Sequence, residues 1–181
     1  MQKDFGAVSF GALAVNTVTF IFVTGSTWLD SLVTTVTRSR WSHVALRFEQ
    51  ENLLVEALVG RGLILQPGHK YDAWPTRMEL SRTIPPAAYA EMLAVSRRWA
   101  GGNIPYGYQT CAAIGLKELF GRKAGGWALD HLSGKTSKTM VCSELIVNLW
   151  RIAAPDFFAG REPRLVSPDE LYRVLNDGSA K

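Results

Sequence analysis

The chain has 181 residues, of which 47% are hydrophobic and six are tryptophans, so it can bury one full core without disulfide support. A single domain spanning residues 1–181 is therefore expected. The net charge of +4 comes from dispersed basic residues, which gives no reason to expect a nucleic-acid partner. A loose basic concentration between residues 117 and 138 fits an acidic partner and a solvated loop equally well. Two cysteines in different settings do not suggest a disulfide framework, which favours a reducing compartment.

The first apolar stretch, residues 7–23, predicts neither an export signal nor a membrane span. Asn16 and two threonines interrupt it, no small-residue cleavage pattern is present, and a span needs roughly 20 apolar residues. Its second half, residues 17–23, is rich in β-branched and aromatic residues and is followed by turn-forming residues, which predicts a central strand. We therefore expect the protein to be cytoplasmic as synthesised.

A helix is predicted next, over residues 30–37, and the periodicity then changes to two residues. Residues 43–48 and 53–58 are apolar runs separated by a short polar turn, which predicts a β-hairpin. A further strand is predicted over residues 63–66, after Gly62 and before a Pro-Gly pair.

The predicted hairpin brings two polar side chains together. With the turn centred on Gln50 and Glu51, paired residues sum to 101, so Ala45 faces Glu56 and His43 lies diagonally across on the same face. Diagonal pairs lie on the order of 7 Å apart at the backbone, within reach of a carboxylate and an imidazole. Such a carboxylate can fix the tautomer of His43 and favour its protonated form. An ordinary His and Glu pair on a solvated strand face is the alternative.

The remaining elements follow from periodicity and from Gly and Pro positions. They are a strand within residues 73–83, helices over residues 87–100 and 109–120, a long surface loop over residues 121–138, and a helix that begins at Ser167 and Pro168. Cys111 falls mid-helix among apolar neighbours and is assigned to the core. His69 and His131 fit no motif and are assigned to surface loops.

The segment from residue 139 to residue 150, TMVCSELIVNLW, predicts an amphipathic helix with Cys142 in its first turn. Unpaired N–H groups and the helix dipole favour a negative charge there, and so lower the pKa of a thiol. A buried structural cysteine is the alternative, since free cysteines are commonly buried. The His43 and Glu56 pair makes Cys142 a candidate nucleophile with a base.

Six segments, in this order, resemble the circularly permuted branch of the NlpC/P60 papain-like superfamily. They are the first strand and helix, Trp41-Ser42-His43-Val44-Ala45-Leu46, Leu54-Val55-Glu56-Ala57, Gly62 with its strand, Ile104-Pro105-Tyr106, and Val141-Cys142-Ser143-Glu144-Leu145-Ile146. This branch includes YiiX/YaeF-like cysteine hydrolases and is related to lecithin:retinol acyltransferase-type enzymes. The resemblance covers residues 17–175. In ordinary papain-like enzymes the cysteine precedes the histidine, and here the order is reversed, as permutation implies.

The resemblance implies an α+β fold in which an antiparallel β-sheet packs against helices and the catalytic cysteine lies at a helix N-terminus. It implies that Cys142 is the nucleophile, that His43 is the base and that Glu56 orients His43. Tyr106 occupies the family's Pro-Tyr position, so it is implied to line the substrate site and to donate to the oxyanion. No cofactor or metal is expected, because the two cysteines and three histidines show no ligand spacing.

Three functions remain open from the sequence. The first is a cysteine amidase or peptidase that cleaves a cell-wall-type peptide through an S-acyl-enzyme, as the wider superfamily suggests. The second is a lipid-directed acyltransferase, thioesterase or lipase-like enzyme, with peripheral lipid contact and with Trp28, Trp41, Trp74 and Trp127 lining an apolar groove. The third is a non-catalytic binding domain. Without an export signal, a cell-wall enzyme would need delivery by lysis, a phage particle or a secretion machine.

Overall fold

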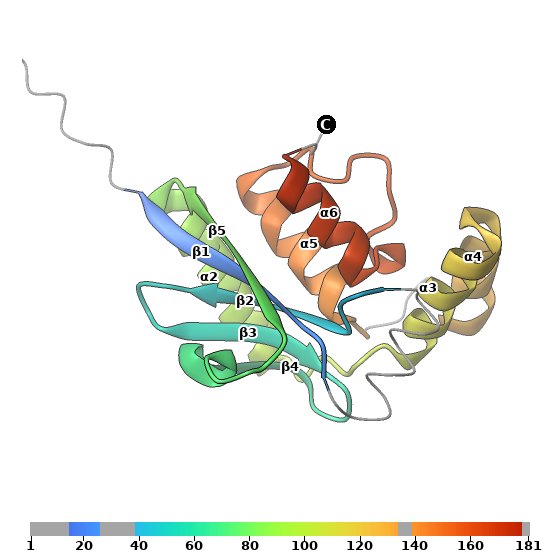
Figure 1. Cartoon of the computed structure of the whole chain (residues 1–181), viewed down its shortest axis with the longest axis horizontal. Coiled ribbons are helices and arrows are strands. Elements are labelled where there is room, and N and C mark those ends of the chain that lie inside the picture. Colours follow the sequence, from blue (N-terminus) through green and yellow to red (C-terminus); the bar gives the residue numbers. More distant parts are fainter. Residues whose placement is uncertain (1–14, 26–38, 134–138, 179–181) are drawn as a thin grey trace, which may run out of the picture.

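The computed structural model describes residues 15–25, 39–133 and 139–178. The described residues form an α+β structure built on one antiparallel sheet with the strand order β4-β3-β2-β1-β5 (Figure 1). The strands are β1 (Asn16–Val23), β2 (His43–Phe48), β3 (Leu53–Leu58), β4 (Gly62–Pro67) and β5 (Arg77–Ile84). The predicted strands are all present, and β1 is an interior strand, as predicted. The helix predicted over residues 30–37 lies outside the described residues.

Five α-helices and three shorter helical turns complete the described parts of the chain. The α-helices are α2 (Pro86–Gly101), α3 (Tyr108–Phe120), α4 (Arg122–Ala128), α5 (Cys142–Ala153) and α6 (Pro168–Asp177). The shorter turns are η1 (Gly68–Tyr71), η2 (Leu129–Ser133) and η3 (Pro163–Leu165). The Oγ of Ser167 accepts a bond from the Glu170 N–H at 3.2 Å, which caps α6 at the predicted residue.

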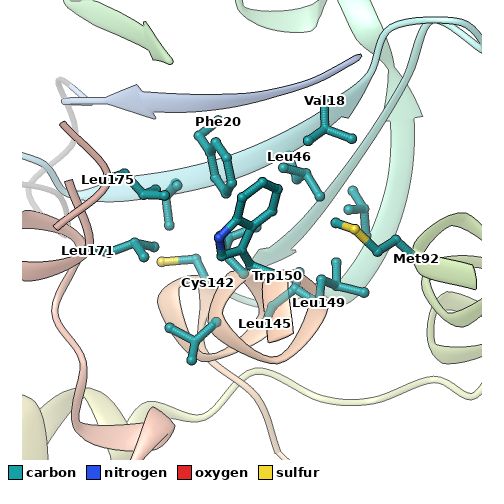
Figure 2. Packing of buried hydrophobic residues seen from close by; sticks show 14 of the residues in the cluster. Val18, Phe20, Leu46, Met92, Cys142, Leu145, Leu149, Trp150, Leu171 and Leu175 are labelled. Carbon is teal, nitrogen blue, oxygen red and sulfur yellow. The ribbon is translucent and has the colours of Figure 1, made fainter. Parts of the chain in front are cut away.

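The main core lies between one face of the sheet and the helices α2, α5 and α6. Three of its members come from different elements, Phe20 from β1, Met92 from α2 and Trp150 from α5 (Figure 2). The rings of Phe20 and Trp150 meet edge to face with centroids 5.0 Å apart. This packing fixes α5, and with it Cys142, against the sheet. The opposite face of the sheet carries a smaller buried cluster to which η1 contributes Tyr71.

The register of the β2 and β3 hairpin is the predicted one. Leu46 pairs with Val55 and Phe48 with Leu53, so paired residue numbers sum to 101. Because side chains alternate along a strand, this register puts His43 and Glu56 on the same face. The polar pair predicted from the sequence therefore has the predicted geometry.

The prediction of a long surface loop over residues 121–138 is wrong for its described part. Residues 122–128 form α4 and residues 129–133 form η2, and both pack on α3 through Ala113, Ala128 and Leu129. One of the glycines that suggested a loop, Gly125, serves helix packing instead. A Cβ built on Gly125 would lie 2.5 Å from the Cβ of Lys117, so only glycine lets the two helices come this close. Residues 134–138 lie outside the described residues.

Candidate active site

Cys142 is the first residue of α5 and is almost fully buried, with 4% of its surface exposed. The residue before it, Val141, has an extended backbone, so the chain turns into the helix directly at the thiol. Backbone N–H groups of Val44 and Ser143 donate hydrogen bonds to Cys142. These donors and the unpaired N–H groups of the first turn favour a thiolate at this position.

His43 begins β2 and connects Cys142 to Glu56. Its Nε2 lies 3.0 Å from Oε2 of Glu56, and the Glu56 side chain is fully buried. His43 is also hydrogen-bonded to the thiol of Cys142. With Nε2 engaged by the carboxylate, Nδ1 is the ring nitrogen that remains for the thiol. The structure thus brings together all three residues that the sequence singled out, in the order thiol, imidazole and carboxylate.

Glu56 has two further partners, Lys70 and Tyr71, which sequence reasoning missed. The Tyr71 hydroxyl donates to Oε2 of Glu56 at 2.7 Å, and the Lys70 ammonium pairs with Oε1. Both residues belong to η1, which folds back over the sheet after β4. The Pro-Gly pair that precedes them in the sequence predicts a turn, but no sequence pattern predicts which strand that turn contacts.

The three central groups shift one another's pKa values strongly. Burial alone would lower the pKa of His43, but its hydrogen bonds and charge interactions with Cys142 and Glu56 raise it to about 9. Burial would raise the pKa of Glu56, but His43, Lys70 and Tyr71 lower it to about 2. Burial also opposes ionisation of Cys142, yet the hydrogen bond and charge of His43 lower its pKa below the ordinary value. At neutral pH these shifts favour an imidazolium held by a carboxylate, beside a thiol that ionises more readily than an ordinary cysteine.

Tyr106 lies beside this group. It forms a parallel bridge with Met140, two residues before Cys142, and burial together with the charges of Cys142 and Cys111 raises its pKa well above the usual value. A close backbone contact holds the segment ahead of it, since the Leu63 N–H donates to the Ile104 carbonyl at 2.9 Å. Gly62 has a φ of 71°, and a Cβ built on it would lie 2.2 Å from that carbonyl oxygen. The glycine is thus required by both its conformation and this contact.

The assignment of Cys111 to the core is wrong. Cys111 is partly exposed, and the Tyr106 hydroxyl lies 3.3 Å from its sulfur. Burial and the charge of Cys142 raise the pKa of Cys111 to about 11, although the bond to Tyr106 opposes this. The reason for the error is that α3 turns this side chain toward Tyr106, which a helical period alone does not reveal. The two cysteines therefore have opposite pKa shifts.

The other residues named from the sequence lie away from Cys142 or in other settings. His69 and His131 are exposed, as predicted, but they belong to η1 and η2 and not to loops. Trp41 is buried in the main core, Trp74 packs on Tyr71, and Trp127 stacks on His131, so these tryptophans do not line one groove. Trp28 lies outside the described residues.

Within the described ranges, no group of three or more His, Cys, Asp or Glu side chains is arranged to hold a metal ion. In the same ranges, no helix has the length and apolar character needed to cross a membrane. No protein-family model, curated protein or solved structure matches this chain.

Proposed function

We propose that this chain is a cysteine hydrolase or acyltransferase that works through an S-acyl-enzyme, with Cys142 as nucleophile, His43 as base and Glu56 as the residue that orients His43. The observation that carries the proposal is the continuous contact from the thiol of Cys142 through His43 to the buried carboxylate of Glu56. A nucleophile, a base within hydrogen-bond reach and a group that orients the base are the parts of thiol catalysis.

The reaction would proceed in two acyl-transfer steps. The Cys142 thiolate attacks the substrate carbonyl, and the backbone N–H at the start of α5 stabilises the oxyanion. His43, already protonated, gives its proton to the leaving nitrogen or oxygen, and the bond from the carbonyl carbon to that atom breaks. Water, deprotonated by His43, then attacks the thioester and releases the acid and the free thiol. An acceptor alcohol or amine in place of water would make the same site a transferase.

The fold we propose for this chemistry is the circularly permuted papain-like fold of the NlpC/P60 superfamily. Its support is the chain order, with His43 and Glu56 on neighbouring strands upstream and Cys142 at the start of a later helix that packs on the same sheet. Papain-like thiol catalysis pairs a cysteine nucleophile with a histidine base. The arrangement here supplies both parts in permuted order.

The substrate we propose first is an amide, of the kind found in cell-wall peptides, because the superfamily resemblance favours it. A lipid ester or thioester is the second candidate, and a structural observation favours it. Exposed apolar side chains gather on α3, α4 and η2, and α3 begins at Tyr108, whose ring meets that of Tyr106 beside the thiol. Exposed apolar side chains on a hairpin that begins beside the site suit an acyl chain better than a peptide.

The proposal is tested by comparing the two thiols. Iodoacetamide at neutral pH should modify Cys142 much faster than Cys111, and p-nitrophenyl acetate should leave one acetyl group on the protein, detected by intact mass spectrometry. The Cys111→Ser protein should retain both reactions and Cys142→Ser should lose them. Equal, slow alkylation of both thiols, with no acetyl-protein formed, would show that Cys142 is a structural cysteine.

A further inference from the structure

The helical hairpin of α3, α4 and η2 exposes an unusual amount of apolar surface. Five of the eight large hydrophobic side chains that are exposed among the described residues belong to it, although it spans only residues 108–133. They are Tyr108, Leu119, Phe120, Trp127 and Leu132, with exposed fractions between 44% and 71%. Scattered exposed apolar residues need no explanation, but such a concentration on one element marks a binding surface.

The hairpin stands as a lobe of its own beside α5 and α6 and away from the sheet (Figure 1). Its internal cluster, Ala113, Ala128 and Leu129, is separate from the main core. Lys117 joins the lobe to the body, since its ammonium reaches Glu170 of α6 at 2.6 Å and the Leu165 carbonyl at 2.8 Å. The tip, where α3 meets α4 at residues 119–123, begins within one helical turn of this anchor, and Arg122 shares a hollow with Arg161 and Glu170 of the body.

Two cations lie among the exposed apolar groups at this tip. Arg122 and Lys123 directly follow Phe120 and Gly121, both are exposed, and neither forms an ion pair with another described residue. Lys123 and Trp127 are one helical turn apart on α4 and so share a face. The acidic side chain nearest in sequence, Glu118, is paired with Lys117 at 2.9 Å. Glu162 and Glu170, which share a hollow with Arg122, are paired with Arg164 and with Lys117 and Arg161. The tip thus combines aromatic side chains with positive charge that is not directly paired with any described acidic residue.

We propose that this hairpin docks on an anionic phospholipid bilayer through exposed side chains of its tip and of α4, with Phe120 and Trp127 inserted at the interface and with Arg122 and Lys123 on the lipid phosphates. Aromatic side chains of amphipathic character favour the headgroup level of a bilayer, and basic residues beside them are attracted by anionic lipids. A second copy of the chain is a poorer occupant of this surface. In a two-fold contact each tip would bring its uncompensated cations against those of its partner.

Docking at the tip would place the thiol site at the far end of α3 from the lipid surface. α3 has 13 residues, so it spans roughly 20 Å from Tyr108, next to Tyr106, to Phe120 at the tip. An acyl chain drawn from the bilayer along this helix would meet the site at its far end. The docking itself does not rest on the proposed thiol chemistry, because binding to a bilayer requires no turnover.

The test is sedimentation of the full chain with vesicles of phosphatidylcholine alone and of phosphatidylcholine mixed with phosphatidylserine. Binding is expected only with phosphatidylserine and should weaken as salt is added. The R122Q/K123Q protein should bind roughly 30-fold more weakly, since each basic residue near an anionic surface contributes about fivefold. The F120A/W127A protein should lose at least about tenfold. Cys142→Ser should bind as the wild type does.

Two matched controls change the same kinds of residue elsewhere. R97Q/R98Q removes an adjacent pair of exposed basic residues from α2, and V15A/V59A truncates two exposed apolar side chains away from the hairpin. Both proteins should bind normally. The fluorescence of Trp127 should shift to shorter wavelength with anionic vesicles, and Trp127→Phe should remove that shift.

Three results would overturn the proposal. They are no binding to anionic vesicles, binding that the tip and control variants reduce equally, and a stable dimer that F120A/W127A dissociates. Circular dichroism of each variant separates lost binding from lost folding, and the charge variant changes only exposed side chains. A protein that binds vesicles but does not acylate Cys142 would uphold the docking and refute the thiol chemistry.

Discussion

At the scale of single residues, the proposed thiol chemistry depends on His43 being protonated beside an ionised Cys142. The pKa of Cys142 is lowered from its ordinary value, and the imidazolium persists until about pH 9. The alkylation rate of Cys142 should therefore rise at a lower pH than that of an ordinary cysteine. Acyl transfer, which also needs the His43 proton, should fall as the pH rises through about 9. Rates of alkylation and of acyl transfer, each measured from pH 5 to pH 10, test both predictions.

His43→Asn should slow the alkylation of Cys142 at pH 7 by more than about tenfold, because burial then raises the pKa of the thiol against only the backbone N–H groups of Val44 and Ser143, and each unit lowers the thiolate fraction tenfold. His131→Asn, which changes an exposed histidine of η2, is the control and should leave the rate unchanged. A rate in His43→Asn equal to that of the wild type would mean that the helix N-terminus alone activates Cys142.

The residues of this site differ in how far sequence could reveal them. Strand alternation was enough to pair His43 with Glu56, and a helix start was enough to distinguish Cys142. Lys70 and Tyr71 could not be found, because their contact with Glu56 depends on how η1 folds over the sheet. Cys111 was misassigned because helical periodicity shows which face of α3 carries the side chain, but not which residue that face contacts. Local geometry can be predicted from residues that are near one another in the sequence. Contacts between segments that are distant in the sequence cannot be predicted in this way.

At the scale of elements, the start of α5 carries a second buried acid. Glu144 accepts a bond from the Val141 N–H at 3.3 Å, yet burial raises its pKa to about 7, despite that bond and the charge of Arg164. Because this folded-state pKa exceeds that of an unfolded glutamate, its contribution to stability is complete below about pH 4.5 and is lost as the pH rises through about 7.

Glu144→Gln keeps an acceptor for the Val141 N–H and removes the ionisation. It should be more stable than the wild type at pH 8, by on the order of 3 kcal/mol, and equally stable at pH 4. Urea unfolding at the two pH values measures the difference. Glu91→Gln, an exposed glutamate of α2, is the control. An equal change at both pH values would assign the effect to packing and not to charge.

The α3 and α4 hairpin shows why glycine misled the sequence prediction. Two adjacent glycines have different roles, since a Cβ on Gly125 would lie 2.5 Å from the Lys117 Cβ whereas a Cβ on Gly126 would meet nothing within 4 Å. Gly125→Ala should destabilise the hairpin by roughly 1–3 kcal/mol, and Gly126→Ala should stabilise it by up to about 1 kcal/mol. Amide hydrogen exchange of residues 108–133 should rise in the first protein and fall in the second.

At the scale of the whole molecule, Glu56 links segments that are distant along the chain. Its carboxylate joins β3 to His43 of β2 and to Lys70 and Tyr71 of η1, and His43 joins this group to α5 through Cys142. Sequence patterns predicted every strand of the sheet because each depends on local periodicity. They could not predict this junction, in which one buried charge holds four elements together.

The pKa of Glu56, about 2 in the folded protein, lies below that of an unfolded glutamate. Its contribution to stability is therefore complete above about pH 4.5 and is lost as the pH falls through about 2. The shift corresponds to on the order of 3 kcal/mol, so the free energy of unfolding of the wild type should decline between pH 5 and pH 2.

Glu56→Gln should be less stable at pH 6 by roughly 3–5 kcal/mol, because the charges of His43 and Lys70 are left without a carboxylate. Its stability should then change little between pH 5 and pH 3, so that the two proteins converge on acidification. Urea unfolding at each pH measures this, with Glu91→Gln as the control. Parallel pH profiles would instead show that the acid sensitivity of the fold arises from other carboxylates and that Glu56 serves mainly to orient His43.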